Sequence, residues 1–457
     1  MRWMPIIALC GAALAGPVVA DPADPWYTQT GFTPVERVEI RLHNPLDTAR
    51  TNSPVVIPRA ALPMLHDVHE LWITLVDPTT PGIAEPDSQT RAREGAHGRL
   101  GETNGHAIDY QLDDIDQDGL WDEMFLMADF APKETKVIYA YIGAQMRGWN
   151  PHRTHAAIGS YMRHTVPFWE SENIGWKLWF PDSADVYGKR KPQLMSNRIY
   201  MENLDGYAVS LIDPGLGSDI MSVDDSFGGG GFAVLDNPAD PNAVSRARFT
   251  PEANLSHRFN GGPVSDTRYA FTVLANGPLR SMVRVRIMNW DSGYGRYEAD
   301  QVYSAYAGED YATARVTFTT FAPKVGARFV AGIRKHGSEA FNRQSGGMVV
   351  TAGPETIRNP DDKEAVQPDM KVSFAGAGLV VKDKYRPQYL FSPARQGNHL
   401  FVMEPTPDRS FEYLIAAGWS EGEQRKTAEA FGAYVERVAR EYNAPIEFTG
   451  ATKQSRK

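Results

Sequence analysis

The chain contains almost no cysteine. Cys10 is the single cysteine among 457 residues, and it lies within an apolar stretch at residues 5–16. Leu9 precedes it where a lipidated cysteine needs a small residue, so a lipoprotein anchor is not expected. A disulfide framework is excluded for the rest of the chain, and we expect no such cross-links to stabilise the fold.

Long hydrophobic runs are also absent, apart from that N-terminal stretch. Arg2 precedes the stretch, and the small residue Ala20 comes directly before Asp21. This order is typical of a cleavable signal peptide over residues 1–20, and the apolar part is too short to span a bilayer stably. We therefore expect a periplasmic or secreted protein without a membrane anchor.

Basic clusters and several catalytic signatures are missing as well. The chain has 47 Lys and Arg against 56 Asp and Glu, a net charge of −9, and no basic run typical of nucleic-acid binding. It has no HExxH motif, no triad order and no nucleophile elbow. The glycine run at residues 228–231 is not a dinucleotide fingerprint, because no strand–turn–helix pattern surrounds it. An anionic substrate would need a local cationic pocket.

Alternation of apolar and polar residues is the main periodic pattern. It recurs at residues 38–42, 283–287 and 314–318 and is typical of strands with one buried face. We expect an all-β fold, a large antiparallel β-sandwich with one C-terminal helix over 427–442. The expected divisions are a signal peptide over 1–20, an N-terminal β-region over 21–145 within the same domain, the main sandwich over 146–448 and a disordered tail over 449–457.

An acidic segment at residues 111–123 is the most distinctive local motif. Its alternating aspartates end at Gly119, a spacing that turns carboxylates toward a hard cation while glycine makes the sharp turn. Phe125 stands where an EF-hand would place its bidentate glutamate, so the loop is not a complete EF-hand. The alternative is a metal-free acidic turn between strands. The candidate ligands of a structural Ca²⁺ ion are Asp114, Asp116, Asp118 and Asp122.

A second segment combines aromatic, acidic and basic residues. Glu170 and Glu172 face the same side if residues 168–180 form a strand. Tyr187, Lys189 and Arg190 follow and supply one acid/base hydroxyl and two cations within four residues. This mixture suits an anionic sugar, whereas the alternative is a surface strand with ordinary salt bridges.

Taken together, these segments resemble a bacterial family of secreted proteins known as DUF4861, a domain of unknown function. The matching pieces occur in order at residues 111–123, 131–135, 169–172, 175–176, 185–190, 219, 228–231, 277–280, 332–336 and 417–419. The chain departs from the family pattern in two places. Gly217 and Ser218 precede Asp219 where family members often carry Trp-Gly-Met. Met201 follows Tyr200 where family members carry a Tyr-His pair, so no histidine role is carried over there.

The resemblance implies a role in polysaccharide breakdown and a β-supersandwich like that of galactose mutarotases. We therefore expect an enzyme that acts on uronic-acid-containing oligosaccharides by β-elimination, a lyase or a dehydratase. The expected catalytic residues are Tyr187 and His164 as base and acid, with Lys189 and Arg190 to neutralise the uronate carboxylate. The expected substrate-binding residues are Gln111, Trp169, Glu170, Glu172, Trp176, Asp219, His336 and Trp419.

Two other function classes fit the same residues. A glycoside hydrolase would use two carboxylates, for which Glu170 and Asp219 are the candidates. A non-catalytic carbohydrate-binding protein would instead expose tryptophan rings. Convergence of Glu170, Tyr187, Arg190 and His336 in one cleft would favour an enzyme. No organic cofactor is expected, and the sequence leaves the oligomeric state open.

Overall fold

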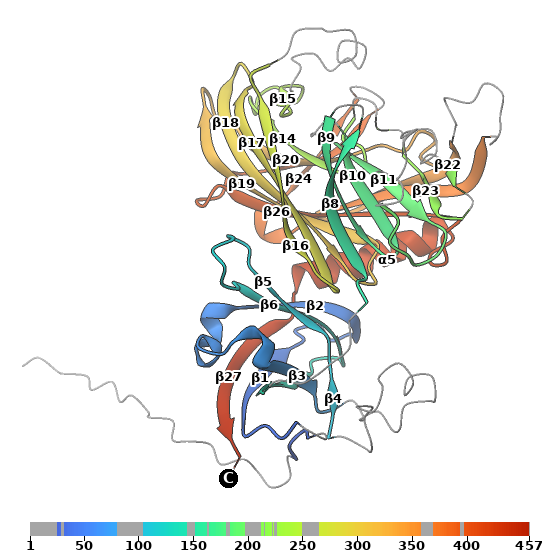
Figure 1. The fold of residues 1–457 in the computed structure, drawn as a ribbon. Coiled ribbons are helices and arrows are strands. Elements are labelled where there is room, and N and C mark those ends of the chain that lie inside the picture. Colours follow the sequence, from blue (N-terminus) through green and yellow to red (C-terminus); the bar gives the residue numbers. More distant parts are fainter. Residues whose placement is uncertain are drawn as a thin grey trace, which may run out of the picture.

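The computed structural model has a predominantly β-stranded chain (Figure 1). The described residues are 25–28, 32–79, 104–143, 151–161, 164–179, 183–196, 212–213, 215–221, 223, 226–248, 265–357, 369–393 and 397–456. Neighbouring strands in all five described sheets are antiparallel. The predicted all-β fold with a C-terminal helix is confirmed, whereas the predicted signal peptide lies outside the described residues.

Three sheets build the larger of two β-sandwiches. The eight-stranded sheet has the order β16 (Arg268–Asn276), β17 (Arg280–Asp291), β18 (Gly295–Tyr306), β19 (Tyr311–Pro323), β26 (Ser410–Trp419), β23 (Met370–Val381), β22 (Met348–Ile357) and β21 (Phe341–Ser345). The six-stranded sheet has the order β12 (Ile212–Asp213), β13 (Gly217–Asp219), β11 (Ser183–Lys189), β10 (Ile174–Trp179), β9 (His164–Ser171) and β8 (Thr154–Tyr161). The five-stranded sheet of this sandwich has the order β15 (Val244–Ser245), β14 (Gly231–Leu235), β20 (Arg328–Arg334), β25 (Asn398–Met403) and β24 (Gln388–Ser392).

Alternation decides which side chains these sheets bury. Val283, Val285 and Ile287 of β17 are fully buried in one core that all three sheets share, while Arg286 between them is exposed. Backbone hydrogen bonds from β11 to the segment before β14 join the six- and five-stranded sheets, with Ala184 N donating to Gly230 O at 3.2 Å. These two sheets therefore form one layer and the eight-stranded sheet forms the other.

The smaller sandwich comes from the N-terminal region and has its own hydrophobic core. Its five-stranded sheet has the order β27 (Glu447–Ser455), β1 (Glu36–His43), β7 (Thr135–Ile142), β3 (Ile73–Asp77) and β4 (His106–Ala107). Its second sheet has the order β2 (Arg50–Pro58), β6 (Glu123–Phe130) and β5 (Tyr110–Asp113). Short 3₁₀ helices lie at Arg59–Ala61, Pro63–Leu65, Glu70–Trp72 and Asp383–Tyr385.

Helix α5 (Ala428–Asn443) lies between the two sandwiches (Figure 1). Thr427 caps its first turn, with the hydroxyl accepting a hydrogen bond from Ala430 N at 3.2 Å. Its buried face, which includes Phe431 and Val435, packs on β22, β23 and β26. The helix predicted over 427–442 is confirmed to within one residue. Among the described residues, no helix combines the length and the apolar character needed to cross a lipid bilayer.

The disordered tail predicted over residues 449–457 is wrong for most of that segment. Residues Glu447–Ser455 form β27, which pairs with β1 along its whole length. Buried Gln454 accepts a hydrogen bond from Arg37 at 2.7 Å and donates one to Glu39 at 2.8 Å. The polar residues of this segment have charged partners on β1, such as Arg37 and Glu39. The smaller sandwich is thus closed by the C-terminal end of the chain.

Candidate active site

The six-stranded sheet has one apolar face, which packs in the shared core, and one polar face on its opposite side. Trp176 and Leu178 of β10 and Val186 of β11 point into the shared core. The alternate residues point to the opposite face, where Lys177 lies opposite Asp185 across the β10–β11 pair. Tyr187 pairs in turn with Gly175 on β10 and with Asp219 on β13. The register therefore places four titratable side chains together on one face.

These four side chains form a buried polar cluster, which we call the β11 cluster: Lys177, Asp185, Tyr187 and Asp219. Each of these residues is between 0 and 8 % exposed to solvent. The Lys177 ammonium donates to the Tyr187 hydroxyl at 3.0 Å and pairs with the Asp185 carboxylate at 3.1 Å. One cation thus bridges a phenol and a carboxylate in a region with little water.

Burial changes the acidity of both carboxyls in the β11 cluster. Burial raises the pKa of Asp185, although the Lys177 charge opposes the change. Burial and the neighbouring Asp185 charge raise the pKa of Asp219 well above its ordinary value. Of the two carboxyls, Asp219 therefore holds its proton more strongly, while Asp185 pairs with the lysine. Charged groups buried with perturbed pKa values are typical of functional sites.

A second buried pair lies beside the cluster on the same face. The Lys189 ammonium contacts the Glu170 carboxylate and the carbonyl oxygens of Ser171 and Gln193, the last at 2.8 Å. Glu170 also accepts from Ser196 N at 3.0 Å. Despite its burial, the Lys189 charge and these hydrogen bonds lower the pKa of Glu170 to about 2. All three ammonium protons of Lys189 have acceptors within the protein, so its predicted role in neutralising a substrate carboxylate is wrong.

The acidic loop between β5 and β6 brings three of its four predicted ligands together. Carboxylate oxygens of Asp114, Asp116 and Asp122 lie within 4.8 Å of one another. Asp114 also accepts backbone hydrogen bonds from Gln117 at 2.6 Å and from Gly119 at 2.9 Å, which closes the loop. This donor set fits a hard cation such as Ca²⁺.

Asp118 is not part of this group. Its carboxylate instead accepts a hydrogen bond from Leu120 N at 2.8 Å.

Comparison with known families places this site in context. The model of a family described as "Domain of unknown function (DUF4861)" matches residues 87–448. The chain belongs to the DUF4861 family. The matched region contains the whole β11 cluster and ends within β27. A search of curated proteins gives no significant match.

Several solved structures are similar to this DUF4861 protein at low identity. A protein in glycosyl hydrolase family 38 and an alpha-mannosidase, both from Enterococcus faecalis, are each 10 % identical with a TM-score of 0.44. They align with 92 % of this chain, which spans about half of their own length (48 % and 46 %). A 4-alpha-glucanotransferase from Thermococcus litoralis is 9 % identical over 58 % of this chain and 41 % of its own, with a TM-score of 0.23.

The predicted aromatic contacts with a sugar are wrong. Trp169 and Trp176 are 0 and 1 % exposed and point into the core, where Trp169 stacks on Tyr303 at a centroid distance of 4.0 Å. Trp419 is also buried, and its indole nitrogen donates to Lys189 O at 3.2 Å. All three rings contribute to packing because the inward face of each strand is the aromatic one.

Arg190 follows Lys189 and so points to the other side of the strand. Its guanidinium lies 5.4 Å from the Trp419 ring centroid and 3.5 Å from Glu421. His336 lies 3.4 Å from Glu355 and borders a separate small cavity. Glu170 and Tyr187 therefore share a face, but Arg190 and His336 do not join them in one cleft.

Two further predicted substrate contacts are structural. The Gln111 amide accepts from Arg280 N at 2.8 Å and donates to Arg280 O at 3.0 Å, so it holds β17 rather than a sugar hydroxyl. Glu172 pairs with Arg153 at 2.7 Å and accepts from Gly308 N at 3.0 Å. His164 begins β9, and its side chain lies outside the described part of the structure.

Lys177 and Asp185 are the members of the cluster that sequence reasoning missed. A signal for them exists in the alternation itself. Lys177 stands between buried Trp176 and Leu178, and Asp185 precedes Tyr187 by two positions. Alternation therefore places Lys177 and Asp185 on the face opposite the apolar one, but a polar face does not by itself show that this face is covered.

Proposed function

We propose that this DUF4861 protein is a carbohydrate-active enzyme that cleaves or dehydrates uronic-acid-containing oligosaccharides by β-elimination. The observation that carries the proposal is the β11 cluster, in which the Lys177 ammonium contacts the Tyr187 phenol and Tyr187 pairs across the sheet with the buried Asp219. β-Elimination needs a base for the proton next to the uronate carboxylate and an acid for the departing oxygen. The cluster supplies one group of each kind.

In this proposal Tyr187 is the base. The Lys177 ammonium, 3.0 Å from its hydroxyl, stabilises the phenolate that accepts the C5 proton. The electrons of the C5–H bond form the C4–C5 double bond as the C4–O bond breaks. Asp219 gives its proton to the departing oxygen, which leaves as a sugar hydroxyl in a lyase or as water in a dehydratase. Lys177 also offsets the negative charge that develops beside the uronate carboxylate.

Glu170 and Lys189 position this site rather than react in it. Their ion pair lies beside Gly175, where an added Cβ would stand 3.5 Å from Glu170 Cβ and 3.7 Å from Tyr187 Cβ. The pair thus fixes the strand that carries Tyr187. Because all members of the β11 cluster are buried, the proposal requires the substrate to displace whatever covers this face of β10, β11 and β13.

Two substitutions test the proposal directly. Tyr187→Phe removes the base and Asp219→Asn removes the acidic proton, and each is expected to lower turnover by at least 100-fold, the scale typical of acid–base catalysis. The readout is the ultraviolet absorbance of new unsaturated uronates. Tyr413→Phe is the matched control, since Tyr413 is equally buried and accepts a hydrogen bond from Gln301 at 2.7 Å in the eight-stranded sheet. Unchanged turnover in both cluster variants would refute the assignment.

A glycoside hydrolase is the second candidate, favoured by the closeness of two buried carboxyls, Asp185 and Asp219. The Asp185 charge helps to keep Asp219 protonated, which is the pairing of base and acid that sugar hydrolysis uses. Glu170 is a poor partner for Asp219 in this role, because Lys189 and Ser196 already occupy its carboxylate oxygens. Products that gain water would favour the hydrolase, and unchanged saccharides would favour a binding protein.

The proposal includes a setting and a metal. A periplasmic or secreted location follows from the predicted signal peptide, and a structural Ca²⁺ ion in the acidic loop follows from the three converging carboxylates. Asp114, Asp116 and Asp122 would hold the ion. They are separate from the β11 cluster, so the metal would stabilise the smaller sandwich and take no part in the reaction.

A further inference from the structure

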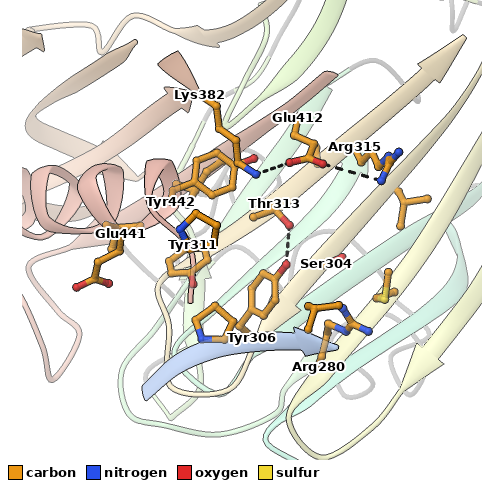
Figure 2. Close-up of a pocket in the computed structure, with 18 of the residues that line it drawn as sticks. Arg280, Ser304, Tyr306, Tyr311, Thr313, Arg315, Lys382, Glu412, Glu441 and Tyr442 are labelled. Carbon is orange, nitrogen blue, oxygen red and sulfur yellow. Dashed lines mark hydrogen bonds and ion pairs between the residues drawn. The ribbon is translucent and has the colours of Figure 1, made fainter. Parts of the chain in front are cut away.

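A cavity of about 470 Å³ lies where the smaller sandwich, the eight-stranded sheet and α5 meet (Figure 2). Its walls come from β2 and β6, from β17, β18, β19 and β26, and from the end of α5. No member of the β11 cluster lines it. Ligand pockets are roughly 300–1,000 Å³ and often lie between domains, so this cavity has the size and place of a binding site.

The fold already uses four of the charged groups in the wall. Arg280 pairs with Asp113 and lies 2.9 Å from Glu123. Arg50 donates to Ala444 O at 2.7 Å, and Glu441 accepts from Arg437 at 2.8 Å. These contacts fix the two sandwiches and the helix around the cavity and give each of these four groups a partner within the protein.

The remaining charges lie in a row along one side of the cavity (Figure 2). Lys382 contacts Glu412 at 2.5 Å, and Arg315 lies 4.0 Å from the other oxygen of the same carboxylate. One carboxylate thus faces two cations, which leaves a local charge of +1 in a chain whose net charge is −9. The Arg315 side chain is 60 % exposed, so its planar guanidinium can receive a carboxylate in two-point contact.

Tyrosine rings and hydroxyls complete the wall. Tyr306, Tyr311 and Tyr442 line the cavity, and the Tyr306 hydroxyl bonds Thr313 at 2.8 Å. The Tyr442 hydroxyl is buried and has no hydrogen-bond partner among the described residues. Lys382 lies 4.4 Å from the Tyr442 ring centroid and holds that ring in place. A buried polar atom without a partner is costly for a fold and marks a position where a ligand can supply one.

We propose that this cavity binds a hexuronate unit of an oligosaccharide, at a site distinct from the β11 cluster. Arg315 and Lys382 receive the carboxylate, Glu412 and the Tyr442 hydroxyl bond ring hydroxyls, and the tyrosine rings contact the apolar face of the sugar. The choice of a uronate rests on the proposed function, whereas the site itself rests on the cavity.

Calorimetric titration with glucuronic acid tests this site. The Tyr187→Phe protein is used, so that no turnover occurs during the titration. We expect saturable binding, at least tenfold weaker binding of neutral glucose, and at least a tenfold loss when Arg315→Ala is added. Arg296→Ala is the matched control, because this β18 arginine is 81 % exposed and does not line the cavity. Absent uronate binding, equal binding of glucose, or an Arg315→Ala affinity within twofold of its parent would overturn the proposal.

Tyr442→Phe separates a binding role from a structural one. Because the hydroxyl has no partner among the residues that the structure describes, its removal is expected to keep or raise the Tm while weakening uronate binding by about fivefold or more. A lower Tm with unchanged affinity would contradict the assignment. The two tests are independent. A failure to bind glucuronic acid would not change the turnover measured for the Tyr187 and Asp219 variants, and a lack of turnover would not change the measured binding.

Discussion

Glu170 and Asp219 lie on the same face of one sheet, and burial raises the pKa of both, yet their neighbours shift the two pKa values in opposite directions. Glu170 has Lys189 and Ser196 as partners, so its pKa falls to about 2. Asp219 has the charge of Asp185 nearby, so its pKa rises well above the ordinary value. At the residue scale, this difference separates a group that holds the structure from one that can transfer a proton.

The Glu170–Lys189 pair is expected to be essential for stability. Glu170→Gln leaves a buried ammonium without its counter-charge, which costs about 3–5 kcal/mol of unfolding free energy. Urea denaturation measures this loss. Glu436→Gln is the control, because its pair with Arg343 at 2.9 Å is partly exposed and contributes about 1 kcal/mol or less. Equal losses in the two variants would contradict the buried-pair assignment.

A pH dependence is expected from Glu309, whose pKa burial raises from 4.5 to about 7. Below pH 4.5 the group is protonated in both the folded and unfolded states, and above about pH 7 it is ionised in both. Between these values only the folded state holds the proton, so stability falls as the pH rises, by about 3 kcal/mol in all. Asp310, raised to about 6, acts in the same direction.

Urea unfolding across this pH window checks the dependence. Glu309→Gln should flatten the decline, and an unchanged slope would contradict it. Glu170 does not interfere, because its contribution is lost only as the pH falls from 4.5 toward about 2.

Sequence analysis grouped Tyr187, Lys189 and Arg190 by their spacing in the chain, whereas the structure places Tyr187 and Lys189 on one side of the strand and Arg190 on the other. Alternation could not say which face of a strand meets the core, so the roles given to Trp169 and Trp176 were wrong. Nor could it pair Lys177 with Asp185, because that contact depends on the register between two strands.

At the scale of elements, β27 is a strand that local sequence pattern could not predict. The helix before it was predictable from local periodicity, since a helix satisfies its own backbone. A polar strand at the chain end has no such local signal. Its backbone partners lie on β1, some 400 positions earlier in the chain, with Glu36 opposite Ser455.

Gln454→Ala is expected to destabilise the smaller sandwich. The substitution leaves buried Arg37 and Glu39 with fewer hydrogen bonds, at a cost of about 1–3 kcal/mol. Lys453→Ala on the same strand is the control, because its contact with Glu36 at 3.0 Å is a surface ion pair. Thermal melting of both variants gives the comparison, and a larger loss for Lys453→Ala would contradict the structure of this edge.

The acidic loop is expected to respond to calcium. If Asp114, Asp116 and Asp122 hold Ca²⁺, a concentration of 100 times Kd should stabilise the protein by about 3 kcal/mol, and a chelator should reverse this. Asp116→Asn should abolish the response, whereas Asp118→Asn should largely keep it, since Asp118 is outside the three-carboxylate group. A Tm that neither calcium nor chelator changes would leave the loop as a metal-free turn.

At the scale of the whole molecule, the two proposed sites lie in different places. The β11 cluster lies in the larger sandwich, and the proposed uronate cavity lies between the two, beside α5 (Figures 1 and 2). The all-β class and the family followed from sequence. The cavity did not, because its walls come from strands of both sandwiches and from a helix near the end of the chain.

The central claim is that the β11 cluster performs β-elimination, and isotope incorporation tests it most directly. The protein would be incubated with a panel of uronide oligosaccharides in heavy-oxygen water, with product masses compared between the wild type and Asp219→Asn. We predict unsaturated products that contain no heavy oxygen, formed by the wild type and not by the variant. Saturated products that carry heavy oxygen, or equal product formation by both proteins, would contradict the claim.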